Sequence, residues 1–469
     1  MSVNHRAERL TPLDVQMPAS YIPVLLIFRT TEPATVILPR LQLGLERLVE
    51  YVPWLAGRVH YTTQKGDGKE AQGPEIRWDS GGAPLSIVDR GSVLSSSYEA
   101  LAAQGMPSEA FPADMWPVAM TMFGGGDAAG EPVFTASFFR FADGQGAGLC
   151  VCMHHGAVDG TGFDAVVGLW TRCMAAGDAP PHPDVGRSRS ERLSDALAPN
   201  WGEAAAMSED DMLRLHPEYA REAPPAPAAM PPCRFGTYNV SLARLRAVKE
   251  QLGSHLSFAP STSMVLASVL WSAAARGRAR DGAEATRKLV VSVNGRPRIG
   301  DGFSTAEAPY LGNFAFATVV ELPAETLAAA QPEGAAVESL ARVCRAVHQA
   351  VLGVDARYIT RACRLLDGAA GRWAVRFGWD LTSGHFLGFN SWAGLCLYDA
   401  DFGAGLGTPE FVRLPSGGPA DGLCLVLPRK RVLGSSETSE VALQVILSLR
   451  SDELTSLEND ATWRALVDW

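Results

Sequence analysis

The stretch "VCMHHGAVDGTGF" (residues 151–163) decides how the rest of the chain is interpreted. It places two adjacent histidines at the end of an apolar run, and an Asp-Gly pair begins four residues after the second histidine. Successive side chains of a strand point to opposite faces, so His154 and His155 are not expected to face one site. One of the two is therefore predicted to be structural.

Three glycines surround Asp159 in this stretch, at positions 156, 160 and 162. They indicate a tight turn in which the backbone approaches its neighbours closely and a side chain is presented at the mouth of a cleft. A neutral imidazole, with an ordinary pKa near ~6.5, accepts a proton from an alcohol or amine at neutral pH. The context favours a general base over the simpler alternative, a hydrogen-bonded histidine in the core.

Two other chemistries are disfavoured. Histidine and aspartate also bind metals, but adjacent histidines diverge, and the sequence has no His-x-x-x-His pair or Cys-rich set to complete a coordination sphere. A serine hydrolase of the nucleophile-elbow type is disfavoured because no Gly-x-Ser-x-Gly occurs. No metal is expected.

Composition narrows the classes of protein further. A chain of 469 residues exceeds what one hydrophobic core usually organises, so two domains of roughly 200 residues are expected. Hydrophobic residues at 47% and charged residues at 20% are typical of a soluble globular protein. The net charge of −10 disfavours nucleic acid as a partner. The sequence shows neither a signal peptide nor an apolar run of ~18 residues, so we expect a cytoplasmic protein with no membrane partner.

The eight cysteines form no Cys-x-x-Cys pair and are predicted to be buried free thiols.

The order of elements indicates an α/β fold. Short β-rich runs (21–30 and 134–155) alternate with helical ones such as 38–59, whose helix is expected to end near Pro53. The segment "DGQGAG" (143–148) separates two apolar runs and is predicted to close a hairpin, since a phosphate-binding loop would open a helix instead.

Residues 178–235 are rich in Pro, Ala and charge and are predicted to form a long crossover linker. They separate an N-terminal domain (1–177) from a C-terminal domain (236–469). The C-terminal domain is again α/β, and its expected elements are a helix at 261–280, a strand at 288–299, helical structure at 324–352, a hairpin from 422–428 and 440–449, and a last helix.

The segment "HHGAVDG" (154–160) resembles the His-x-x-x-Asp-Gly motif of the superfamily that contains chloramphenicol acetyltransferase, BAHD acyltransferases and peptide-synthetase condensation domains. Further segments appear in the order of the BAHD family, and its fungal branch, which includes trichothecene 3-O-acetyltransferase, looks nearest. These segments are "LTPLDV" (10–15), "VPWLAGRV" (52–59), "NGRPR" (294–298), "YLGN" (310–313) and "SWAGLCLYDADFGAG" (391–405).

The resemblance implies two chloramphenicol acetyltransferase-like domains of mixed sheet flanked by helices, with His155 at their interface. Acyl-CoA, most simply acetyl-CoA, would be the co-substrate, with no bound cofactor, and the protein would be a monomer. His155 would act as general base without an acyl-enzyme. Asp159, followed by the motif's Gly160, would either orient His155 or brace the loop, and bracing is favoured.

The resemblance also assigns structural residues near the C-terminus. Asp401 and Gly403 belong to a segment similar to the Asp-Phe-Gly-Trp-Gly motif, with Ala404 in place of tryptophan. Asp401 is expected to pair with Arg296, in the bidentate contact that suits a structural clasp.

Coenzyme A would need local cations or a helix N-terminus for its phosphates. A predicted helix start carries Ser261, Thr262 and Ser263, for which the alternative role is an N-cap. The basic residues 429–431 are the second candidate, and for them the alternative is a solvated hairpin tip. Asn313 is a candidate for the cofactor and Trp392 for the substrate, with a buried structural role as the alternative for each.

The leading hypothesis is transfer of an acyl group from CoA to a hydroxyl or amine of a small metabolite. A condensation enzyme that takes its acyl group from a carrier protein is the second, and an inactive binding homologue is the third. Retention of both His155 and Asp159 argues against the third hypothesis. No motif identifies the acceptor, because scattered side chains build its pocket.

Overall fold

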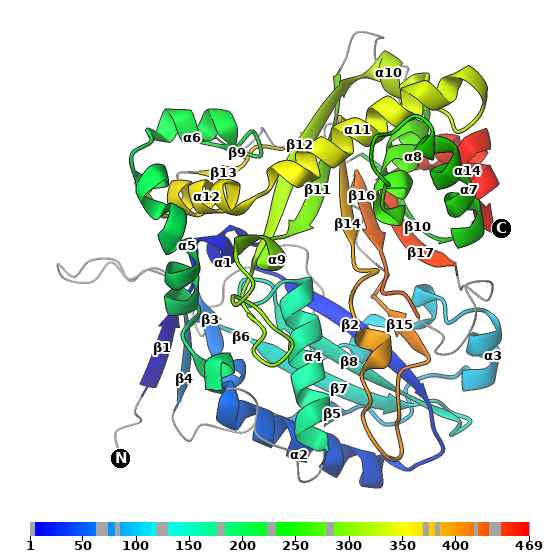
Figure 1. The fold of residues 1–469 in the computed structure, drawn as a ribbon. Coiled ribbons are helices and arrows are strands. Elements are labelled where there is room, and N and C mark those ends of the chain that lie inside the picture. Colours follow the sequence, from blue (N-terminus) through cyan, green and yellow to red (C-terminus); the bar gives the residue numbers. More distant parts are fainter. Residues whose placement is uncertain are drawn as a thin grey trace.

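Two large sheets organise the chain (Figure 1). A computed structural model gives the structure, which describes residues 5–61, 74–79, 85–118, 130–175, 183–222, 231–277, 286–368, 375–379, 385–416, 421–430 and 442–468.

The first sheet has five strands and contains the histidine stretch. Strand β8 runs antiparallel between β2 and β7, and all of its residues are buried. The β7–β8 hairpin confirms the prediction for the glycine segment 143–148. The strand order is β15 (Phe411–Arg413), β2 (Tyr21–Arg29), β8 (Gly146–His154), β7 (Phe134–Arg140) and β5 (Ile87–Asp89).

The second sheet has seven strands and mixes parallel with antiparallel pairs. Strand β14 is parallel to both β11 and β16, whereas β16 and β17 form the predicted late hairpin. The strand order is β12 (Ala315–Pro323), β11 (Thr286–Asn294), β14 (Phe386–Ser391), β16 (Leu423–Val426), β17 (Leu443–Arg450), β10 (Cys233–Val240) and β18 (Val467–Asp468).

Two small sheets hold the remaining strands of the described residues. One holds β1 (His5–Arg9), β4 (Glu75–Asp79), β3 (Arg58–His60) and β6 (Glu131–Pro132), and the other holds β13 (Arg376–Phe377) and β9 (Tyr219–Ala220).

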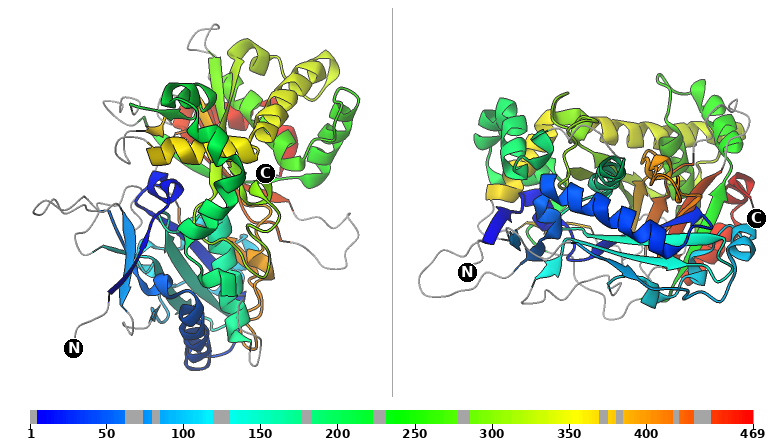
Figure 2. Two further views of the ribbon diagram at one scale, coloured as in Figure 1. Left: turned by 60° about the vertical axis from the view of Figure 1, so that its left-hand side comes forward. Right: turned by 90° about the horizontal axis from the view of Figure 1, so that it is seen from below.

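Helices flank both large sheets (Figures 1 and 2). On the first sheet α2 packs against α4, and the Trp170 indole donates a hydrogen bond to the Leu41 carbonyl at 3.0 Å. The helices are α1 (Pro12–Gln16), α2 (Ala34–Tyr51), α3 (Tyr98–Ala103), α4 (Gly160–Met174), α5 (Arg189–Ala205), α6 (Glu209–Leu215), α7 (Leu242–Gly253), α8 (Thr262–Gly277), α9 (Arg296–Ile299), α10 (Ala324–Ala328), α11 (Val337–Gly353), α12 (Ala356–Gly368), α13 (Ser451–Asn459) and α14 (Ala461–Leu466).

The predicted strand at 288–299 is too long at its C-terminal end. Strand β11 ends at Asn294, and the next residues form the short helix α9. Pro297 has no N–H for the ladder and suits the first turn of a helix, so the chain leaves the sheet here. This turn places Arg296 in the protein interior.

The segment predicted as a linker carries two helices, α5 and α6. Leu193 and Leu197 on α5 are buried in the core of the second sheet, whereas Phe402 and Val412, from late in the chain, are buried in the core of the first. Segments from each half therefore pack on the other half, and the domain limits at 177 and 235 stay a prediction. The α/β class with mixed sheets and flanking helices is confirmed.

None of the eight cysteines forms a disulfide, and six of them are buried; Cys233 is half-buried and Cys396 is exposed. Within the described part of the chain, no helix has both the length and the hydropathy needed to cross a bilayer.

Candidate active site

The two adjacent histidines diverge where β8 ends. His154 is the last residue of the strand and is fully buried, whereas His155 is half-buried. The His155 N–H donates to the Ser20 carbonyl at 2.8 Å, and the Ala157 N–H turns back to the His154 carbonyl at 2.8 Å. The two side chains therefore lie in different surroundings, one in the core and one at its edge.

His154 holds the turn through both of its ring nitrogens. Its Nε2 lies 2.7 Å from Glu131 Oε2, and its Nδ1 accepts a hydrogen bond from the Gly156 N–H at 3.0 Å. Because Nδ1 accepts, Nε2 carries the proton and donates to the carboxylate. Burial lowers the pKa of His154, and Glu131 acts against this shift. Glu131 was missed by sequence reasoning because it lies 23 residues away on another strand.

We predict that His154→Ala destabilises the protein more than it slows chemistry. The change removes two hydrogen bonds from a buried site and leaves the Gly156 N–H unpaired, so the free energy of unfolding should fall by about 1–3 kcal/mol. Glu131→Gln is the matched control, because an amide oxygen still accepts from Nε2. Chemical denaturation measures the effect; wild-type stability of His154→Ala would contradict it.

The ring of His155 has few partners. Its Nδ1 is buried and has no hydrogen-bond partner among the described residues. Burial lowers the pKa of His155 below that of an ordinary histidine, although its own carbonyl, Asp159 and Asn313 act in the opposite direction. The imidazole is therefore neutral at neutral pH, which is the state a general base requires.

Asn313 reaches the main chain of His155 from the second half of the chain. Its Nδ2 donates to the His155 carbonyl at 2.8 Å and to Asp14 Oδ1 at 2.9 Å, and its own N–H also donates to Asp14 Oδ1 at 2.9 Å. Asn313 is fully buried with both amide donors engaged, which disfavours the predicted contact with CoA. Its Oδ1, like the His155 Nδ1, is buried without a partner among the described residues.

Asp14 is a second residue that sequence reasoning missed. Thr11 caps helix α1 and donates from its N–H and hydroxyl to Asp14 Oδ2. Arg189 on α5 donates to the same oxygen at 3.2 Å. The motif "LTPLDV" (10–15) was the available signal, because a capping Thr three residues before an Asp fixes that carboxylate locally.

Asp159 faces away from His155 and toward Arg296. Its two oxygens accept from Arg296 Nη1 and Nη2, each at 2.9 Å, and from the N–H groups of Phe314 (2.7 Å) and Gly162 (2.8 Å). Burial alone would raise the pKa of Asp159, but Arg296 and the two N–H groups lower it below its ordinary value. The carboxylate is thus a charged brace that joins the start of α4 to the second half of the chain.

These contacts leave His155 as an imidazole that is not hydrogen-bonded to any carboxylate of the described residues. Among the described residues, no group of three or more His, Cys, Asp or Glu side chains is arranged to hold a metal.

The sequence profile of the Transferase family matches residues 121–463. The chain belongs to the Transferase family.

The N-terminal part of this Transferase-family chain also matches a trichothecene 3-O-acetyltransferase-like N-terminal domain over residues 20–173. It is similar to trichothecene 8-O-acetyltransferase of Fusarium sporotrichioides, with 24% identity over 97% of this chain and 96% of the relative. Trichothecene 3-O-acetyltransferase TRI101 of the same organism is 26% identical over 94% and 92%.

Solved structures share the fold. TRI101 of F. graminearum in complex with ethyl coenzyme A has a TM-score of 0.78 at 20% identity, covering 99% of both chains. TRI101 of F. sporotrichioides with coenzyme A and T-2 has a TM-score of 0.75 at 21% identity, with the same coverage. The predicted membership is confirmed, and the chain is an acyltransferase with the BAHD fold.

The expected pairing of Arg296 with Asp401 is wrong. Arg296 is used by Asp159, while Asp401 is exposed and accepts from the Gly403 N–H at 2.8 Å. Gly403 has a φ of +74°, so a glycine suits the turn that Asp401 closes. This acyltransferase anchors the loop through Phe402 instead, which packs edge-on against Phe28 and Trp170.

The start of α4 depends on close approach to the second half of the chain. A Cβ on Gly162 would lie 2.1 Å from the Leu311 carbonyl oxygen, and one on Gly160 would lie 2.8 Å from Trp392 Nε1. Trp392 therefore lies against the turn that carries Asp159 and is half-buried. Its predicted role in substrate binding stays a prediction.

Thr262 and Ser263 open helix α8, and Ser261 caps it by accepting from the Met264 N–H at 3.2 Å. The N-cap alternative therefore applies to Ser261. The Ser263 hydroxyl lies 3.4 Å from that of Ser391, the residue before Trp392.

Thr262 lines a cavity of about 380 Å³ together with three cationic side chains, those of Arg246, Lys249 and Arg429, and with Glu250. Of the predicted basic triplet, Arg429 thus faces this cavity, Lys430 donates to the Glu410 carbonyl, and Arg431 lies outside the described residues.

Proposed function

We propose that the chain transfers an acyl group, most simply acetyl, from acyl-CoA to a hydroxyl or amine of a small secondary metabolite. The single observation that carries this proposal is the geometry at the end of β8, where Asp159 is committed to Arg296 and not to the half-buried His155. The related TRI101 enzymes form complexes with coenzyme A and with the trichothecenes T-2 and deoxynivalenol, which supports the choice of donor and of acceptor class.

In the proposed reaction the acceptor oxygen or nitrogen attacks the thioester carbonyl carbon while His155 removes its proton. The tetrahedral oxyanion then collapses, the carbon–sulfur bond breaks, and the CoA thiolate takes the proton back from His155. No bond forms between the acyl group and the protein. General-base assistance of this kind contributes about 10²–10⁴-fold to a rate.

The proposed base is Nε2, because Nδ1 is enclosed. Nε2 can accept a proton only if Nδ1 carries one, and the Asn313 Oδ1 is the nearby acceptor without a partner of its own among the described residues. We assign Asn313 to holding this tautomer of His155. Asp14 and Arg189 support Asn313 from behind, since Asp14 accepts two of its N–H groups.

The CoA phosphates are assigned to the cationic cavity at the start of α8. Thr262, which lines the cavity, is followed by Ser263, whose hydroxyl lies beside that of Ser391. Trp392 follows Ser391 and lies against Gly160, in the turn after His155. This order gives an extended pantetheine arm a path from the cations toward His155. Ser263 is assigned to the wall of that path.

We predict that Lys249→Gln combined with Arg429→Gln raises the KM for acetyl-CoA and leaves kcat unchanged. Exposed charge pairs contribute about 0.2–1 kcal/mol each, so the KM should rise roughly two- to thirtyfold. Dephospho-acetyl-CoA is the matched control, since removal of the 3′-phosphate should reduce the effect of the variant. An equal KM for wild type and variant would contradict the assignment.

The test of the function itself offers the purified protein acetyl-CoA with a panel of alcohols and amines and monitors thiol release. Acyl groups on a carrier protein form the second donor arm. Turnover with CoA donors supports the proposal, and turnover with carrier donors alone favours the condensation enzyme. Binding of acceptors without turnover with either donor favours the inactive homologue.

A further inference from the structure

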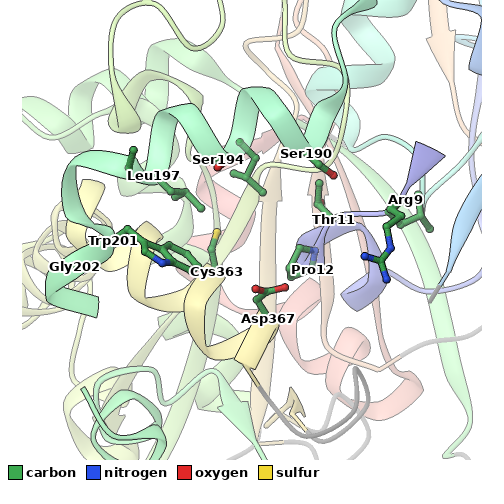
Figure 3. Close-up of a pocket in the computed structure, with 13 residues that line it drawn as sticks. Arg9, Thr11, Pro12, Ser190, Ser194, Leu197, Trp201, Gly202, Cys363 and Asp367 are labelled. Carbon is green, nitrogen blue, oxygen red and sulfur yellow. The ribbon is translucent and has the colours of Figure 1, made fainter. Parts of the chain in front are cut away.

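A second cavity, of about 600 Å³, lies where the end of β1, the start of α1, helix α5 and the end of α12 meet (Figure 3). Thr11 and Pro12 of α1 line it, whereas Asp14 of the same helix contacts Asn313. His155 is not among the lining residues. Helix α1 thus stands between this cavity and the site of acyl transfer.

Apolar side chains of α5 and α12 form one part of the cavity wall, beside the hydroxyl groups of Thr11, Ser190 and Ser194. Leu193 and Leu197, one turn apart on α5, are buried, and Cys363 on α12 is buried near them. Burial raises the pKa of the Cys363 thiol, so it stays protonated and acts as a small apolar group. The half-buried Trp201 supplies an aromatic surface for a flat ring. Pockets of this size and lining bind small organic molecules.

Two opposite charges stand at the rim. Asp367 lies in the last turn of α12, where the helix dipole also favours a cation. Arg9, at the end of β1, is separated from Asp367 by Pro12 in Figure 3. Both residues are exposed, and neither forms an ion pair with another described residue.

We propose that this cavity binds a small aromatic zwitterion, such as a short aromatic peptide. Its ammonium group lies at Asp367, its carboxylate at Arg9, and its ring between Trp201 and the leucines of α5. An apolar surface on α5 and α12, with one acidic and one basic group at the rim of the cavity, matches a molecule that has a ring and both charges. This binding site is additional to the acyl transfer at His155.

The test is a calorimetric titration with L-phenylalanyl-L-phenylalanine, its N-acetyl form and its C-terminal amide. The dipeptide should bind saturably, with one site per chain. Asp367→Asn should raise the Kd of the dipeptide about two- to fivefold and leave the Kd of the N-acetyl form unchanged. Arg9→Gln should do the same for the dipeptide and leave the Kd of the amide unchanged. These paired comparisons isolate each rim charge.

Ala198→Trp adds an indole on the α5 wall and should abolish binding. If Ala198→Trp fails to fold, Ser194→Phe, one turn earlier on α5, is used in its place. His155→Ala should leave the Kd unchanged, so failure of this proposal and failure of the acyl-transfer proposal can be told apart. The proposal is overturned if the dipeptide does not saturate at millimolar concentration, or if its Kd is the same in the rim and cavity-filling variants.

Discussion

Replacement of Asp159 by asparagine is expected to lower the melting temperature and the rate of acyl transfer together. The carboxylate and Arg296 are both almost fully buried and meet through two hydrogen bonds of 2.9 Å. Removal of one partner leaves a buried charge unpaired, which typically costs about 3–5 kcal/mol. The same change loosens the turn between His155 and α4, so turnover should fall with stability. Melting temperature and kcat are measured on the same preparation.

Arg296→Met provides the matched partner variant. If the pair acts as one structural unit, the double variant Asp159→Asn/Arg296→Met should be less destabilised than the sum of the two single changes. An unchanged melting temperature with a collapse of kcat in Asp159→Asn would contradict bracing. Asp159 would then act on the imidazolium, as the aspartate of a hydrolase triad does.

His155→Ala is expected to lower kcat by about 10²–10⁴-fold, the usual contribution of a general base. The protein should keep most of its stability, because the Ser20 carbonyl contacts the backbone N–H of residue 155, which the alanine variant retains. The Kd for CoA should also be unchanged. Thiol release gives the rate, and titration with CoA gives the Kd.

His154→Ala is the control for that experiment, since it removes the neighbouring imidazole from the opposite face of the strand end. An inactive His154 variant of wild-type stability, together with an active His155 variant, would reverse the assignment of the two histidines.

The sequence predicted those features that depend on local pattern. Alternation along a strand separated His154 from His155, and glycines between two apolar runs located the β7–β8 hairpin. Both follow from backbone geometry over a few residues. The α/β class follows in the same way from the alternation of short β-rich and helical runs.

Local sequence pattern could not predict which side chains pair with one another at the site. Asp159 and Arg296 are 137 residues apart, and Asp14 and Asn313 are 299 apart. Any of several carboxylates could have met Arg296, and the expected one, Asp401, instead closes its own turn with Gly403. Only the three-dimensional path of the chain decides such pairs.

Helix α5 shows a third limit. Its segment is rich in charge and contains Pro199, a composition that predicts a linker. Its charged residues are not all solvated, because Arg189 and Arg192 are buried and donate to carbonyls and to Asp14. Composition alone does not distinguish such buried, hydrogen-bonded arginines from those of a solvated segment.

The most direct test of the central claim is the pH dependence of kcat/KM for the unmodified protein with acetyl-CoA and a neutral alcohol. The base must be deprotonated, and burial lowers the pKa of His155 below the ordinary 6.5. The account predicts that the pH at which kcat/KM is half-maximal lies below 6.5, and that kcat/KM decreases tenfold per pH unit once His155 is protonated. A loss of kcat/KM that begins well above pH 6.5, or a profile that persists unchanged in His155→Ala, would contradict a neutral His155 as the base.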